Sequence, residues 1–121
     1  MIGIIGNPRR DGQSCFETLI AYCEKDGRSA HTGTQNIHFT ESAADEMESL
    51  AFKNPRCKDP LMHIILSWRE MELPSNGQVD EAAKIALKEL DLQGCQAVWI
   101  VHSDTENRHV HVVANRIYGS S

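Results

Sequence analysis

Two apolar runs joined by a short polar connection constrain the fold of this chain more than any other feature. Residues 96–102 end in His102, and residues 109–116 begin with His109. Both runs are rich in β-branched side chains and six polar residues separate them, which predicts an antiparallel β-hairpin. His109 and His111 lie two positions apart, so their rings project from one face of a strand, and strand pairing would bring His102 beside them.

Three imidazoles at one point of a hairpin form a candidate metal site. Three neutral imidazoles leave coordination positions open for water or substrate, as in catalytic metal sites. The plainer alternative is that these histidines are packed and hydrogen-bonded, as histidines on apolar strands usually are. We expect a divalent metal ion, and nitrogen ligands favour Mn²⁺, Zn²⁺, Co²⁺ or Ni²⁺ over Mg²⁺. Asp104 is either a carboxylate that orients one imidazole from behind or an ordinary hairpin residue.

Length and composition indicate one globular domain spanning residues 1–121. The chain is 40% hydrophobic and 24% charged, with enough residues for one core. No apolar run approaches membrane-spanning length, and residues 1–5 are too short for a signal-peptide core, so we expect a cytoplasmic protein with no membrane partner. The four cysteines form no Cys-x-x-Cys pair, which indicates neither a zinc ribbon nor a disulfide framework.

The net charge of −5 narrows the ways in which this chain could act on nucleic acid. Neutralisation of phosphates by basic side chains supplies most of the affinity of simple nucleic-acid binders. An acidic chain is therefore a poor candidate for a protein that only grips nucleic acid. The net charge does not exclude a reaction on nucleic acid that takes place at a bound metal.

The first half of the chain predicts one strand and two helices. Residues 1–5 are apolar enough for a short strand, and Ser14 is placed to cap a helix that runs to about Lys25. Residues 29–40 are polar and loop-like, with a possible short strand at 36–39. Ser42 and Asp45 match a capping box that opens a helix ending near Lys53.

The second half predicts a strand, a helix and then the hairpin. Residues 61–68 are apolar enough for a buried strand. Ser75 and Gln78 match a second capping box, and the helix that follows carries apolar residues at helical spacing as far as Leu90. The whole pattern predicts an α+β fold in which an antiparallel sheet is backed by helices.

The order of four motifs resembles that of the relaxases, or mobilisation nucleases, of the MobA/VirD branch. These motifs are Leu-Ile-Ala-Tyr22, Asn54-Pro-Arg, His63-Ile-Ile-Leu-Ser67-Trp and the segment from His102 to Arg116. The resemblance covers nearly the whole chain and implies a relaxase-like palm. Family domains continue beyond the histidine strands, so we expect the chain to be a C-terminally truncated or compact core.

The resemblance implies metal-dependent, tyrosine-mediated nicking of single-stranded DNA at an origin of transfer. Its nucleophile would be Tyr22, which would leave a free 3′-OH and a 5′-phosphotyrosine link. The implied partners are the origin DNA and accessory relaxosome proteins. The family pattern also assigns the remaining site residues: His102 as both catalytic residue and metal ligand, His109 and His111 as metal ligands, Asp104 beside them, and Ser67, Asn115 and Arg116 at the DNA.

Two other classes of protein stay open on the residues alone. The first is a rolling-circle initiator or another metal-dependent phosphodiesterase, which would share the histidine cluster. Initiators place their tyrosine after the cluster, where this chain has only Tyr118. The second is a non-catalytic domain that binds metal or DNA. None of these alternatives assigns a role to Glu70 or Glu72. We expect His63 either to approach the site or to be a buried, hydrogen-bonded histidine.

Overall fold

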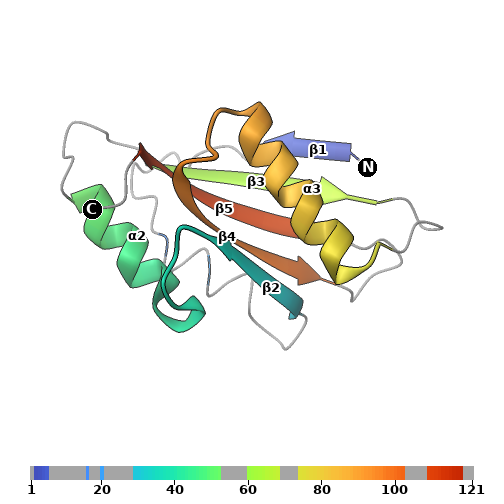
Figure 1. Cartoon of the computed structure of the whole chain (residues 1–121), viewed down its shortest axis with the longest axis horizontal. Coiled ribbons are helices and arrows are strands. Elements are labelled where there is room, and N and C mark those ends of the chain that lie inside the picture. Colours follow the sequence, from blue (N-terminus) through green and yellow to red (C-terminus); the bar gives the residue numbers. More distant parts are fainter. Residues whose placement is uncertain are drawn as a thin grey trace.

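The histidine hairpin forms the centre of a five-stranded antiparallel sheet in the computed structural model (Figure 1). The structure describes residues 2–5, 16, 20, 29–52, 60–68, 74–102 and 109–118. Within them the strands stand in the order β1-β3-β5-β4-β2, and every neighbouring pair is antiparallel. The elements are β1 (Ile2–Ile5), β2 (Ser29–Gln35), a 3₁₀ turn (Thr40–Ser42), α2 (Ala43–Phe52), β3 (Leu61–Ser67), α3 (Asn76–Glu89), β4 (Cys95–His102) and β5 (His109–Tyr118). The expected α+β fold with an antiparallel sheet is confirmed.

Strand β5 lies between β3 and β4, and its alternating side chains separate two cores. Val110 and Val112 face α3, whereas His111 and Val113 project to the opposite face. On the α3 face the helix contributes Val79, Ala83 and Leu87, and the sheet contributes Trp99 among others. On the other face Met47 of α2 packs with residues of β3, β4 and β5, together with Phe16 and Ile20. Each large apolar side chain buried in this way contributes about 1.5–3 kcal/mol.

The start of α3 confirms one of the two expected capping boxes. The backbone N–H of Gln78 donates to Ser75 Oγ at 3.2 Å, and the backbone N–H of Ser75 donates to Gln78 Oε1 at 2.8 Å. Ile85 is one of the apolar residues at helical spacing, but it is 50% exposed. The buried face of α3 is therefore narrower than the sequence predicted. Within the described residues, no helix is long and apolar enough to span a membrane.

The expected capping box at the start of α2 is wrong, because Glu46 and not Asp45 closes this turn. Ser42 lies in the 3₁₀ turn and its hydroxyl donates to Glu46 Oε2 at 2.8 Å. The Glu46 carboxylate also accepts the backbone N–H groups of His38 at 2.8 Å and Phe39 at 3.1 Å. The hydrogen bond from the His38 backbone is the largest cause that lowers the pKa of Glu46. Together with the others it outweighs burial, which would raise this pKa, and lowers it to about 2.

The expected strand at residues 36–39 is also wrong, because the strand lies earlier, at β2. Asn36 has a φ of 57° and ends the strand, and its amide donates to the carbonyl of Cys95 at 3.0 Å. An edge strand is only partly buried and accepts polar side chains. This is why a strand of sequence SAHTGTQ was not expected from its composition. Of the helix expected from Ser14, only Phe16 and Ile20 are described, and both are helical and buried.

The Glu46 carboxylate makes the stability of this region sensitive to acid. Its folded pKa lies below the ordinary value of 4.5, so its stabilisation is fully present above about pH 4.5 and is lost as the pH falls toward 2. We expect Glu46→Gln to lower the free energy of unfolding at pH 7 and to flatten its dependence on pH between 5 and 2. Chemical denaturation at a series of pH values measures both effects.

The matched control for this experiment is Asp45→Asn, which removes an exposed carboxylate from the same helical turn. Asp45→Asn should change stability by a few tenths of a kcal/mol, through the helix dipole alone. Equal losses in the two variants would contradict the assignment of the turn to Glu46.

Candidate metal centre

Three histidines from the β4–β5 hairpin meet on one face of the sheet. His102 and His109 are directly paired across the two strands, and His111 is paired with Ile100. The ring centroids are 5.0 Å apart for His102 and His109, 4.6 Å for His102 and His111, and 5.2 Å for His109 and His111. One ligand nitrogen from each ring lies within 4.8 Å of the other two. The structure therefore brings together the three residues that the sequence predicted as ligands, and we call them the histidine triad.

The donor set of the triad fits a divalent transition ion. Zinc binds imidazole nitrogen at 2.0–2.1 Å, which places two ligands of a tetrahedral ion about 3.3 Å apart. The three nitrogens of the triad lie within 4.8 Å of one another, which is close to this spacing. Three nitrogen donors without a carboxylate favour Mn²⁺, Co²⁺, Ni²⁺ or Zn²⁺ over Mg²⁺.

Two of the three histidines of the triad are buried. The side chains of His102 and His111 are 8% and 9% exposed, and His109 is half-buried. Burial, followed by the nearby imidazoles of His102, His63 and His109, lowers the pKa of His111 to about 4. The lone pair of His111 thus stays available to a cation in mildly acidic solution, because a protonated imidazole is not a ligand.

A fourth histidine touches the triad from β3. His63 Nε2 lies 2.9 Å from His111 Nδ1, and the two rings stack at a centroid distance of 5.1 Å with 22° between their planes. Burial lowers the pKa of His63. Both sequence expectations for His63 are met, since it is a half-buried, hydrogen-bonded histidine that also reaches the cluster.

Ser67 stands next to the triad in the same row of the sheet. It is the last residue of β3 and is paired with His109, which is itself paired with His102. Residues that face each other across antiparallel strands project to the same side. The Ser67 side chain therefore lies on the triad face, beside His109.

Asn115 and Arg116, both expected at the DNA, differ in exposure, and their roles at the DNA stay predictions. Asn115 is fully buried, and its amide donates to the Met47 carbonyl at 3.1 Å and to Gln96 Oε1 at 3.0 Å. Its Oδ1 accepts the backbone N–H of Ile117 at 3.1 Å. The side chain thus ties α2 to the sheet. Arg116 is exposed, but it lies near the opposite end of β5 from His109.

Four of the residues considered from the sequence lie outside the described part of the chain. They are the expected nucleophile Tyr22, the expected orienting residue Asp104, and the unassigned Glu70 and Glu72. Their expected roles stay predictions. Tyr118 is described only as the last residue of β5.

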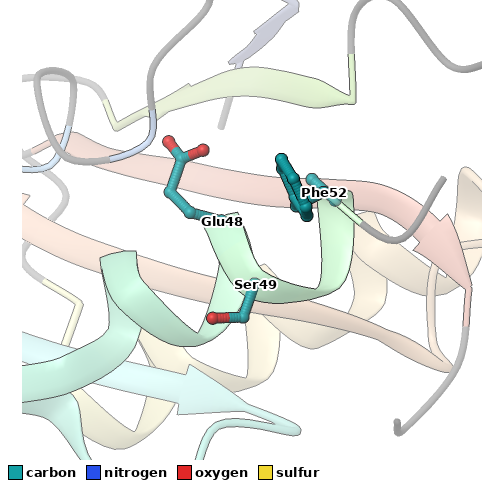
Figure 2. A pocket seen from close by; sticks show the side chains of 4 residues that line it. Glu48, Ser49 and Phe52 are labelled. Atoms are coloured by element: carbon teal, nitrogen blue, oxygen red, sulfur yellow. The ribbon is translucent and has the colours of Figure 1, made fainter. Parts of the chain in front are cut away.

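A hollow on α2 has none of the features of the triad. Among the described residues it is lined by Glu48, Ser49, Ala51 and Phe52, as Figure 2 shows in part. Its one carboxylate, that of Glu48, accepts the backbone N–H of Phe16 at 2.9 Å. Its described lining residues do not form a group of converging ligands, so the triad is the candidate site.

A polar group on the α3 face was not found from the sequence. Asp80 Oδ1 lies 2.8 Å from His31 Nε2 and accepts the indole N–H of Trp99 at 2.7 Å. A Cβ added to Gly33 would overlap the Trp99 ring, so a glycine is needed at this point of β2. Trp99 is therefore a core residue, and this group joins α3 to an edge strand. This polar group could not be predicted because its residues are far apart in the sequence.

The fold is an antiparallel sheet whose central hairpin gathers three histidines on one face. Comparison with known proteins gives the family to which a chain of this kind belongs. Residues 22–120 match the family described as "Relaxase: MobA/VirD2-like, nuclease domain". The chain belongs to this family of relaxase nuclease domains.

Two curated relatives agree with this assignment. The chain is 43% identical over 72 residues to "Protein MobA" of Acidithiobacillus ferrooxidans, which covers 60% of the chain and 18% of the relative. It is 30% identical over 114 residues to "Protein TraI" of Escherichia coli, which covers 88% of the chain and 15% of the relative. The chain thus spans less than a fifth of the length of either protein.

The geometry of the triad predicts that the protein binds one divalent transition ion. Calorimetric titration with Ni²⁺ or Mn²⁺ should give a single site, and the double variant His109→Ala, His111→Ala should lose it. His31→Ala removes a histidine from the opposite side of the sheet and should leave the affinity unchanged. Undiminished binding by the double variant would contradict the assignment.

Proposed function

We propose that this chain is the catalytic core of a mobilisation relaxase. In this proposal it nicks single-stranded DNA at an origin of transfer by metal-dependent transesterification, with Tyr22 as the nucleophile. The observation that carries the proposal is the row Ser67, His109 and His102 with His111 beside it, which gathers a hydroxyl and three imidazoles at one edge of the hairpin. The family membership of the chain supports the same conclusion.

The reaction conserves the energy of the phosphodiester bond. The phenol oxygen of Tyr22 attacks the scissile phosphorus, the bond from phosphorus to the 3′-oxygen breaks, and the phenol proton ends on that 3′-oxygen. The products are a free 3′-OH and a 5′-phosphotyrosine. Because an ester replaces an ester, attack by a 3′-OH can later rejoin the strand.

The phenol and the phosphate set the demands on the site. With a pKa of about 10, a phenol is about 0.1% ionised at neutral pH. Forming the reactive phenolate therefore costs a free energy of roughly 4 kcal/mol. A divalent cation held by the triad would neutralise charge on the phosphoryl oxygens and align the group for attack. His102, His109 and His111 would hold and orient that cation. Ser67, which is paired with His109, would donate a hydrogen bond to a phosphate oxygen.

The packing around Ile20 supports Tyr22 as the nucleophile. Ile20, two residues before Tyr22, belongs to the core cluster that contains Ile100. Ile100 is paired with His111, so this cluster lies on the face of the sheet that carries the triad. Ile20 is therefore anchored on the face of the sheet that carries the triad.

The position of Tyr118 argues against the alternative of a rolling-circle initiator. Tyr118 is nine residues beyond His109 at the opposite end of β5. At about 3.4 Å per residue the two lie about 30 Å apart along the strand. The backbone of Tyr118 is therefore far from the triad, which favours the relaxase proposal over an initiator.

The proposed partners and setting follow from the proposed reaction. They are single-stranded DNA at an origin of transfer, accessory proteins of a relaxosome, and the cytoplasm, where that DNA is found. The acidic balance of the chain implies that specific contacts, and not net charge, would hold the DNA.

The proposal predicts that Tyr22→Phe abolishes the covalent DNA adduct while the protein stays folded and keeps its metal affinity. Only one hydroxyl is removed, so the loss should be confined to the chemistry. Tyr118→Phe is the matched control and should form adduct at the wild-type level. The measurement is incubation of the intact gene product with single-stranded oligonucleotides tiled across the DNA beside its gene, followed by mass spectrometry of the trapped peptide.

Three outcomes would discriminate between the classes of protein. A phosphotyrosine mapped to Tyr22 supports the relaxase proposal. A phosphotyrosine mapped to Tyr118 would replace it with an initiator-like arrangement. Metal binding without any adduct on the tiled DNA would favour the non-catalytic class.

A further inference from the structure

The contact between His63 and His111 assigns a role to a residue that the proposed site does not otherwise use. We infer that His63 is a positioning residue that fixes the ring orientation and tautomer of the metal ligand His111. This inference rests on the proposed metal centre. It goes beyond that proposal because it names which group outside the triad determines how well one ligand binds.

The sheet register places His63 beside His111, and the two rings meet at Nδ1 of His111. Ile65 is directly opposite His111, and His63 is directly opposite Val113, so the two histidines are diagonal neighbours on one face. Diagonal neighbours in an antiparallel pair lie within reach of aromatic side chains. The contact of 2.9 Å is made by Nδ1 of His111, which leaves Nε2 as the nitrogen with which His111 can bind an ion.

His63 is not a fourth ligand in this arrangement. The described residues that can share an ion are His102, His109 and His111, and His63 is not among them. Its Nε2 lies against His111 Nδ1, and its ring stacks on that of His111. His63 therefore supports the ligand His111 by contacting its Nδ1.

The protons of the two rings follow from the requirement that His111 bind a cation. A neutral imidazole has one N–H and one lone pair, and coordination through Nε2 uses the lone pair of that atom. The proton of His111 must then be on Nδ1, from which it donates to His63 Nε2. His63 must in turn accept at Nε2 and carry its own proton on Nδ1. The reverse tautomer would place a proton on the ligating nitrogen and block binding.

Hydrogen bonds of this kind affect metal affinity measurably. A partner that holds the second nitrogen of a ligating histidine raises the basicity of the ligand and fixes its ring, and its loss costs about 10- to 100-fold in affinity. His63 is half-buried, and its hydrogen bond to His111 is shielded accordingly. We expect an effect in this range.

The test compares two substitutions at position 63 with a matched substitution elsewhere. His63→Leu removes the acceptor, whereas His63→Gln keeps an oxygen that can accept from His111 Nδ1. His31→Leu removes a partly buried, hydrogen-bonded histidine from the opposite face and controls for general loss of packing. Zinc affinity of each folded variant is measured by calorimetry with a competing chelator.

The expected result is a 10- to 100-fold loss of Zn²⁺ affinity in His63→Leu, recovery of most of it in His63→Gln, and no change in His31→Leu. Long-range ¹H–¹⁵N NMR of the zinc-loaded protein should show His111 protonated at Nδ1, with His63 protonated at its own Nδ1. A packing role alone would not fix these tautomers. His63→Gln binding as weakly as His63→Leu would overturn the inference.

The same data separate this inference from the proposed metal centre. If the wild type binds Zn²⁺ and the double variant His109→Ala, His111→Ala does not, the metal centre holds. Wild-type affinity in His63→Leu would then overturn the role of His63 alone. If the wild type does not bind Zn²⁺, Ni²⁺ or Mn²⁺, the metal centre fails and the role of His63 fails with it.

Discussion

The candidate site depends on the pairing of β5 with both of its neighbours. The β4–β5 register places His102 opposite His109, and the β3–β5 register places Ser67 opposite the same residue. Because side chains alternate along a strand, a slip of one residue in either ladder would send one set of side chains to the opposite face. Correct register is therefore a requirement of the chemistry as much as of the fold. Val110 and Val112 of β5 enforce it, since both are buried on the face that packs against α3.

The second requirement is that a group of buried imidazoles stays uncharged. Several histidines packed together would repel one another if protonated, and burial alone disfavours their charged forms. The lowered pKa values of His111 and His63 are the consequence. The unprotonated nitrogen of a buried imidazole such as that of His111 suits a cation better than it suits an apolar core. Asn115, farther along the same face, shows the contrasting case, a buried polar side chain fully satisfied by the protein itself.

The sequence predicted the part of the site that depends on local pattern. The hairpin and its three histidines follow from residue spacing, because period-two alternation and a short polar connection leave little choice of geometry. The position of Ser67 beside His109 could not be read from the chain, since it depends on a pairing across more than forty residues. The contact of His63 with His111 was hidden for the same reason. The hydrogen bonds by which Asn115 ties α2 to β5 could not be read from its motif either, because Met47 and Gln96 are distant in the sequence.

The errors in the fold have a similar origin. Glu46 and Asp45 are adjacent acidic residues, and which of them closes the turn depends on a bend at residues 38–42 that composition does not reveal. The strand β2 is polar because it lies at the edge of the sheet, and its pairing with β4 is a long-range contact.

The central claim is that the hairpin holds one cation through three imidazoles, and X-ray absorption spectroscopy of the nickel-loaded protein tests it most directly. The account predicts a first shell in which three imidazole nitrogens contribute the outer-shell scattering characteristic of that ring, with the remaining positions filled by oxygen. It also predicts that the imidazole signal falls by about one third when a single triad histidine is replaced and the ion is still bound. A first shell dominated by oxygen, or an imidazole signal that is insensitive to replacement of His102, His109 or His111, would contradict it.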